Sequence, residues 1–394
     1  MSFLSETLSR VKPSPTIAMT NLARELAAEG RDIISLSAGE PDFDTPAHIR
    51  EAAKAAIDAG QTRYTAVDGI PQLKQAICDK FARDNGLDFT PAQITVGTGG
   101  KQVLYNALMA TLNPGDEVII PAPYWVSYPD MVALAGGTPV VIEAGIEAGY
   151  RISADRLEAA ITPRTKWVIL NSPSNPTGAG YGESHMRALT DVLMRHPHVW
   201  IMSDDMYEHL VFDDFRFVTP AQVEPGLRDR TLTVNGVSKA YAMTGWRLGY
   251  GIMSEEFAAH MARLQTNATS CTAAMTQMAG VEALTGPQDE ADRMVAEFDK
   301  RRKVVVEGLN KLPGVSCVVP KGAFYAFPNI KRTGWKGKEL ATTLLNDTGV
   351  VTIGGPDFGV LGEGYLRLSY ANSTENILKA LDRMGQFLAS RKAA

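Results

Sequence analysis

Short apolar runs without polar alternation constrain the fold of this chain more than any other feature of its sequence. Six of them lie between helical patterns, at residues 94–96, 117–120, 166–170, 199–202, 231–234 and 248–252. Strands that are buried on both faces of a sheet have this composition, whereas half-solvated strands alternate apolar and polar residues. Because helical patterns separate the runs, we predict an α/β fold with a doubly wound, mostly parallel sheet.

The pattern changes after residue 287. A long charged helix is predicted first, then short strands and a closing helix, at residues 289–312, 322–327, 365–369 and from 374 onward. This is typical of a second, smaller α+β domain. We predict a large domain over residues 48–287 and a discontinuous small domain over residues 1–47 and 288–394, because the N-terminal segment is expected to pack with the C-terminal part.

Composition disfavours several kinds of partner. The chain has 39 basic and 44 acidic residues, a formal net charge of −5, and no basic run that would bind nucleic acid. No stretch is apolar over the ~20 residues that a membrane span requires. Cys78, Cys271 and Cys317 have neither metal-ligand nor redox spacing. We therefore expect a cytoplasmic protein with reduced thiols and without a metal site, a membrane span or a nucleic-acid partner.

Polar and glycine-rich loops follow the carboxyl ends of several predicted strands. They comprise residues 97–101, 124–125, 171–178, 203–207 and 235–239. Open α/β sheets bind their ligands beyond the carboxyl ends of the strands. One such loop could be an ordinary turn, but five of them indicate a binding site.

The loop from Gly97 to Lys101 leads from a predicted strand into a predicted helix. Its glycines allow backbone amides to approach an anion, and the helix N-terminus adds a positive end. A tight turn without a ligand is the alternative. The loop is not a Walker loop, because Gln102 follows Lys101 where that motif requires serine or threonine.

Two ionisable residues stand where burial is expected. Asp204 ends an apolar run, so it either has a cationic partner, such as a protonated pyridine nitrogen, or caps a helix. Lys239 follows another run among small and apolar residues. Desolvation there would lower its pKa and favour Schiff-base chemistry, although most lysines are solvated. Arg247, eight positions further on, can bind a phosphate through two nitrogens.

The segment Gly236–Gly249 resembles the lysine signature of class I, fold-type I aminotransferases, which use pyridoxal 5'-phosphate (PLP). Further family motifs occur in the expected order, at residues 38–43, 175–178, 204–207 and 367–370. The resemblance covers nearly the whole chain and is strongest to bacterial aspartate aminotransferases, including those that also accept prephenate. It implies a seven-stranded sheet in the large domain and a homodimer with shared active sites.

The resemblance also implies the cofactor site. Lys239 would form the Schiff base and shuttle the substrate proton, and Asp204 would keep the pyridine nitrogen protonated. Tyr207 and Asn175 would hydrogen-bond the ring hydroxyl oxygen, and Trp125 would stack on the ring. The phosphate ligands would be Gly99, Gly100, Lys101, Ser238 and Arg247, together with Tyr64, which would reach the phosphate of the partner subunit.

For the substrate, the resemblance implies that Arg367 binds the α-carboxylate bidentately, with Gly39, Asn175 and Trp125 beside it. Some relatives bind the distal carboxylate with an arginine of the partner subunit, but residues 265–271 contain none. Lys12 is therefore the candidate for this role, and Lys101 is the next. Asp205 stands where many relatives have glutamate.

The function that we predict is amino-group transfer between aspartate or glutamate and a 2-oxo acid, by a ping-pong mechanism. The acceptor would be oxaloacetate, 2-oxoglutarate or prephenate. A transaminase of broader or aromatic specificity and a β-lyase on the same fold stay open as alternatives, because small pocket differences select the reaction on a shared cofactor.

Overall fold

A computed structural model describes residues 3–11, 13 and 15–390 of the chain. Its centre is a seven-stranded sheet in the order β2-β8-β7-β6-β5-β3-β4. The strands are β2 (Ile94–Gly97), β3 (Glu117–Ala122), β4 (Thr138–Glu143), β5 (Thr165–Asn171), β6 (Trp200–Asp204), β7 (Thr231–Gly236) and β8 (Gly249–Ile252). β8 is antiparallel to both of its neighbours, and every other pair is parallel. The predicted doubly wound, mostly parallel sheet is confirmed.

The central strands are buried on both faces, as their composition indicates. Val118 and Ile120 of β3 belong to one apolar cluster, whereas Ile119 between them belongs to another. β4 is the strand that we did not predict. It lies at the edge of the sheet, three of its six residues are exposed and the other three are only partly covered, and it contains Pro139, which is typical of an edge strand.

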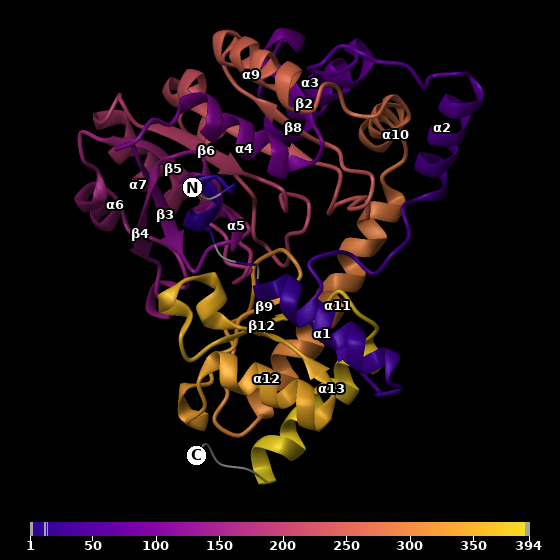
Figure 1. Ribbon diagram of the computed structural model, residues 1–394, viewed down its shortest axis with the longest axis vertical. Helices are drawn as coiled ribbons and strands as arrows, with labels where there is room; N and C mark the ends of the chain where they lie inside the picture. The colour runs from indigo at the N-terminus through magenta and orange to yellow at the C-terminus, as the bar shows by residue number, and fades with distance from the viewer. Residues whose placement is uncertain (1–2, 12, 14, 391–394) are drawn as a thin grey trace.

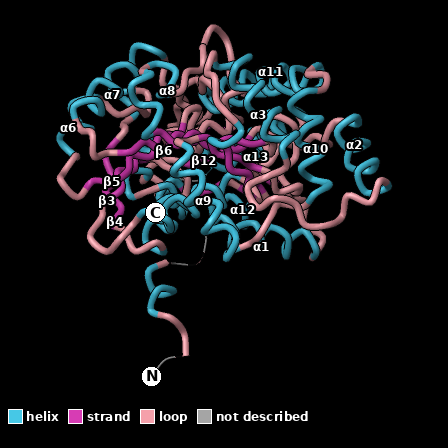
Figure 2. The backbone as a smooth tube through the Cα atoms, turned by 90° about the horizontal axis from the view of Figure 1, so that it is seen from above, coloured by secondary structure: helices cyan, strands magenta, loops and turns pink. Residues whose placement is uncertain are grey.

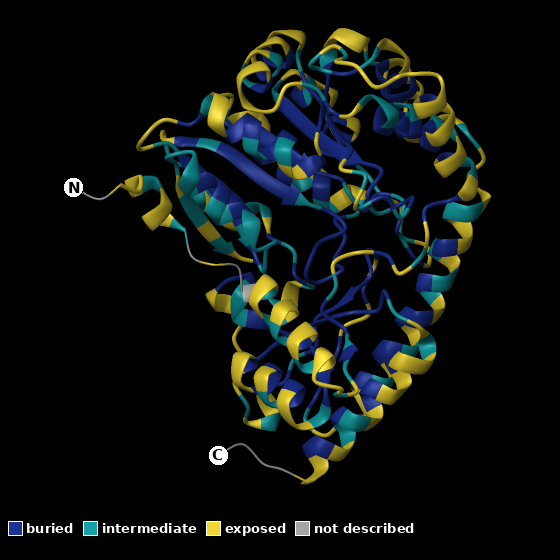
Figure 3. Ribbon diagram, turned by 45° about the vertical axis from the view of Figure 1, so that its right-hand side comes forward, coloured by how far each residue is buried: buried dark blue, intermediate teal, exposed yellow. Residues whose placement is uncertain are grey.

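The helices of this unit pack around the sheet on both of its sides (Figure 2), and Figure 3 shows their outer faces exposed while the central strands are buried. They are α2 (Ala47–Asp58), α3 (Pro71–Asn85), α4 (Gly100–Thr111), α5 (Ser127–Leu134), α6 (Ala154–Ala160), α7 (Glu183–Arg195), α8 (Pro220–Val223), α9 (Glu255–Ala268) and α10 (Ala274–Thr285). None of the helices in the described ranges is long and apolar enough to cross a membrane.

The long helix α11 (Asp289–Lys311) leads from this unit to a smaller one (Figure 1). The smaller unit contains a three-stranded antiparallel sheet in the order β11-β12-β9. Its elements are β9 (Tyr325–Ala326), α12 (Gly337–Thr348), β10 (Val350–Val351), β11 (Ile353–Gly354), β12 (Leu366–Ser369) and α13 (Thr374–Ser390). Short 3-10 helices are η1 (Glu6–Arg10), η2 (Pro91–Gln93), η3 (Ile146–Ala148), η4 (Pro225–Arg230), η5 (Lys331–Thr333), η6 (Gly355–Phe358) and η7 (Val360–Gly362).

The N-terminal segment joins the smaller unit through a strand pair. β1 (Ile34–Ser35) pairs in parallel with β10, with Ile34 opposite Val350. α1 (Pro15–Ala28) precedes β1, and its residue Ala23 belongs to one apolar cluster with Leu345 of α12 and Val351 of β10. The pairing places residues from both ends of the chain in one unit, as a discontinuous small domain requires.

Candidate active site

A cavity of about 580 Å³ lies at the carboxyl ends of the large sheet's parallel strands. The strands β5, β6 and β7 end at residues 171, 204 and 236, and the cavity wall includes Asn171, Asp204, Ser238 and Lys239. Arg367 of β12 lines it from the smaller unit. Parallel strands present their carboxyl ends at one edge of a sheet, which brings these separate segments together.

Lys239 projects from the loop after β7 into the cavity. Its ammonium donates a hydrogen bond of 2.5 Å to the carbonyl oxygen of Gly39. Desolvation lowers the pKa of Lys239 to about 8, although the nearby Glu40 carboxylate acts in the opposite direction. A larger fraction of its amine is therefore uncharged near neutral pH than in a solvated lysine, and only the uncharged amine is a nucleophile.

Asp204 is a buried carboxylate at the end of β6. It accepts hydrogen bonds from the hydroxyl of Tyr128 at 2.6 Å and from the backbone N–H of Met206 at 3.4 Å. Burial raises its pKa, and the bond from Tyr128 opposes this change. Among the described residues, no cationic side chain forms an ion pair with Asp204. It does not cap a helix either, because the next helix begins at Pro220. A cationic ligand group would stabilise the ionised carboxylate.

Arg367 is a buried guanidinium on the opposite wall, only 4% exposed. It donates to the carbonyl oxygen of Ser37 at 2.6 Å and to Oδ1 of Asn175 at 3.2 Å, and its Nε has no partner in the described part of the chain. The rings of Tyr325 and Phe358 lie 4.8 and 4.9 Å from its guanidinium carbon. No carboxylate of residues 3–11, 13 and 15–390 pairs with it. Such a cation is a receptor for a carboxylate ligand.

Two cationic side chains, those of Lys101 and Arg247, lie at the N-terminus of α4. Gly99 precedes this helix with a φ of +83°, and a Cβ there would overlap the guanidinium of Arg247. Gly100 and Lys101 line the cavity. The ammonium of Lys101 lies 4.7 Å from the ring centre of Trp125, and burial, together with the charge of Arg247, lowers the pKa of Lys101. Helix amides and two cations at one end of the cavity can hold an anion such as a phosphate.

The sequence did not reveal some residues of the site. Tyr325 is one of them, and it belongs to the site because its hydroxyl lies 2.9 Å from that of Tyr207. Burial raises the pKa of Tyr207 well above its ordinary value. Tyr128, beside Asp204, is another. The cavity wall also includes one face of α1, formed by residues 17, 20, 21 and 24, and their helical spacing was the available signal.

Two predicted residues are not placed in the cavity of this chain. Tyr64 is 91% exposed and lies outside its wall. Lys12 lies outside the described residues. All other predicted residues line the cavity or, like Gly99, lie beside a residue that does.

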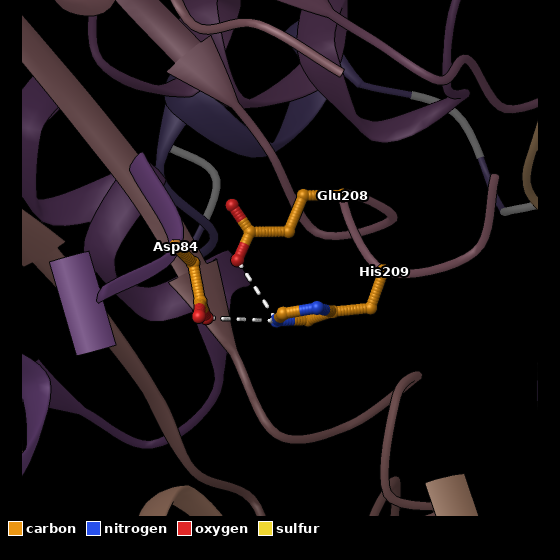
Figure 4. A group of neighbouring side chains, drawn as sticks. All are labelled: Asp84, Glu208 and His209. Atoms are coloured by element: carbon orange, nitrogen blue, oxygen red, sulfur yellow. Dashed lines mark ion pairs between the residues drawn. The ribbon is translucent and has the colours of Figure 1, made fainter. Parts of the chain in front are cut away.

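Glu208 and His209 follow Tyr207 in the chain and form a cluster with Asp84 of α3 (Figure 4). Nε2 of His209 is 2.9 Å from the carboxylate of Glu208 and 3.9 Å from that of Asp84. The fully buried ammonium of Lys80 also pairs with Glu208. Burial alone would raise the pKa of Glu208, but the attraction of Lys80 lowers it. A cation of the chain thus already neutralises Glu208, and the pair joins α3 to the turn that carries Tyr207.

We predict that Glu208→Gln lowers the free energy of unfolding by about 3–5 kcal/mol, because it removes the buried partner of the Lys80 ammonium and leaves only Asp84, at 4.0 Å. Denaturant titration measures this change. Glu51→Gln, which removes an exposed ion pair with Lys54, is the control and should change stability little. The double variant Lys80→Met with Glu208→Leu should recover part of the loss. Equal stability of Glu208→Gln and the natural protein would contradict the role of this pair.

The cavity brings together an amine of lowered pKa and a buried guanidinium, a combination that can bind a carboxylate beside a nucleophile. Residues 31–384 match the family model of aminotransferase class I and II, and the chain belongs to this family. The resemblance inferred from the sequence is thereby confirmed.

Relatives and solved structures match over nearly the whole chain. The aspartate/prephenate aminotransferase of Cereibacter sphaeroides (strain ATCC 17029 / ATH 2.4.9) is 60% identical, with 99% of each chain covered. The aspartate aminotransferase of Rhizobium meliloti (strain 1021) is 51% identical over 96% of this chain and 94% of the other. A crystal structure of the aspartate aminotransferase from Rhizobium meliloti has a TM-score of 0.95 at 49% identity, with all of both chains covered.

Proposed function

We propose that this aminotransferase uses PLP and moves the amino group between aspartate or glutamate and a 2-oxo acid, with prephenate among the acceptors. The observation that carries the proposal is one cavity with two groups on its walls. These are Lys239, with its pKa lowered to about 8, and Arg367, a buried cation that no carboxylate of the described residues neutralises. An amino or keto acid presents a carboxylate to the second group and its reacting carbon to the first. The names of the relatives support the choice of aspartate and prephenate.

The cavity fits PLP at three points. Arg247 and the start of α4 offer cations and amides to a phosphate, and the absence of a Cβ at Gly99 leaves room for the Arg247 guanidinium there. Asp204 offers a buried carboxylate to a protonated ring nitrogen. Lys239 offers an amine to the aldehyde. When bound, PLP supplies an electron sink for the negative charge that develops at the substrate Cα.

Other steps of the proposed reaction, which are substrate orientation and proton transfer, depend on residues of the chain. Arg367 binds the α-carboxylate and thereby orients the Cα–H bond. Lys239, with its lowered pKa, removes the proton from Cα and returns a proton during the second half of the exchange. Asp204 holds the proton on the ring nitrogen, and its burial strengthens that charge pair.

Lys239 should be the attachment point of the cofactor. The protein purified with PLP should be yellow, and borohydride should fix the cofactor on the peptide that contains Lys239. Lys239→Ala should lose nearly all turnover, because both the attachment point and the proton carrier are removed. Lys54→Ala, on the exposed face of α2, is the control and should stay active. An active, colourless protein that gains nothing from added PLP would refute the proposal.

Arg367→Lys keeps the charge but not the planar guanidinium. We expect kcat/KM to fall for every amino and keto acid, by an amount corresponding to roughly 2–5 kcal/mol for a desolvated charged pair. Steady-state kinetics on a panel of amino donors measure the loss. Unchanged kcat/KM across the panel would show that the α-carboxylate binds elsewhere.

We propose that Lys12 contacts the distal carboxylate, with Lys101 of the cavity wall as the next candidate. Lys12→Ala should reduce kcat/KM for aspartate, glutamate and prephenate by roughly 10- to 150-fold, because one charge-assisted hydrogen bond is lost. Alanine and phenylalanine, which have no distal carboxylate, should be affected little. Equal losses for both groups of substrates would contradict the assignment, and no loss for either would direct the test to Lys101.

We also propose a homodimer in which Tyr64 reaches the phosphate of the partner subunit. The 91% exposure of Tyr64 supports this arrangement, as does the N-terminal segment with η1, which projects from the body of the chain (Figure 2).

We propose the domain division at residues 47/48 and 287/288 on the same basis as the sequence analysis, and the pairing of β1 and β10 supports it. A cytoplasmic location also stays a prediction.

A further inference from the structure

Residues 37–45 cross the active site and contact both of its principal cations. The carbonyl oxygen of Ser37 accepts from Arg367, and that of Gly39 accepts from Lys239. Further along, the carboxylate of Glu40 accepts from the hydroxyl of Thr244 at 2.9 Å. The segment therefore lies against the loop that runs from Lys239 to Arg247.

Thr45 makes the last contacts of this segment. Its side chain is buried. Its hydroxyl donates to the carbonyl oxygen of Ala242 at 2.7 Å and accepts from the indole N–H of Trp246 at 3.0 Å. One hydroxyl group thus joins two points of the loop, and no motif of the sequence had distinguished it.

The loop has a strained backbone at both of these points. Ala242 has a φ of +50° and Arg247, which follows Trp246, has a φ of +58°. Residues with a side chain rarely adopt this conformation, and they keep it only where their surroundings fix it. Thr45 binds the first strained residue directly and the neighbour of the second. Its two hydrogen bonds are therefore placed to hold the loop in this form.

The conformation of Arg247 determines where its guanidinium lies. One nitrogen donates to the carbonyl oxygen of Thr244 at 2.8 Å, and the other lies against Gly99 at the start of α4. In a relaxed backbone at Arg247 the side chain would leave the chain in another direction. The guanidinium would then no longer face the amides with which it forms the anion site.

We infer that Thr45 is a positioning residue: its hydroxyl fixes the loop between Ala242 and Arg247 and so aims Arg247 at the phosphate of the cofactor. The inference rests on the proposed function, because it takes the phosphate of PLP as the ligand of Arg247. Thr45 itself contacts neither cofactor nor substrate in this role.

Cofactor affinity of the apoenzyme tests the inference. Thr45→Val removes the hydroxyl at nearly constant size, and it should weaken the binding of PLP and of inorganic phosphate by about 10-fold, as expected for the loss of hydrogen bonds that hold a charged group. Pyridoxal, which lacks the phosphate, should bind as before. Thr45→Ser keeps the hydroxyl and should restore both affinities. Trp246→Phe removes one of the two hydrogen bonds and should have an intermediate effect.

Thr352→Val is the matched control. Thr352 is also fully buried, but its hydroxyl has no hydrogen-bond partner within the described ranges, so this variant should bind PLP normally. Unchanged affinities in Thr45→Val would overturn the inference. Equal losses for PLP and pyridoxal, or a Thr45→Ser variant as weak as Thr45→Val, would also overturn it, since they indicate a general packing role. A natural apoenzyme that binds no PLP would instead refute the proposed function.

Discussion

Two buried charges of opposite sign, one on each side of the cavity, govern this structure. Asp204 stands at the end of β6 in the large sheet, and Arg367 stands on β12 in the small one. If they approached each other they would form an ion pair, and the cavity would lose both functional groups. Tyr128 holds the carboxylate, while Ser37 and Asn175 hold the guanidinium. Hydrogen bonds with the chain stabilise each charge, but no side chain of opposite charge in the described residues neutralises it, so a ligand can do so.

The two sheets and the segment between them hold the two sides of the cavity in fixed positions relative to each other. The carboxyl ends of the parallel strands fix the wall with Asp204 and Lys239, and the three-stranded sheet fixes the wall with Arg367. The segment after β1 crosses between them, with Ser37 bound to Arg367 and Gly39 bound to Lys239. Behind the site, the buried pair of Lys80 and Glu208 anchors the turn after β6 to α3. Rigid elements that hold a site from several directions limit the reorganisation that ligand binding requires.

The sequence predicted those features that depend on local composition. Strands buried on both faces have unbroken apolar runs, so six of the seven strands of the large sheet were predictable, and Asp204 and Lys239 were identified because they follow such runs. The edge strand β4 lacks this signal. Tyr128 and Tyr325 were missed because their roles come from contacts across 76 and 118 positions of the chain. Such contacts are set by packing, which no local pattern records.

The pairing of β1 with β10 has a consequence for biosynthesis. Ile34 is synthesised well before its partner Val350, and before Arg367 of β12. Contacts between such distant positions form late because a long loop must first be closed. A nascent chain therefore contains every strand of the large sheet before Arg367 has been synthesised. The cavity wall that carries Arg367 is completed after the wall that carries Asp204 and Lys239.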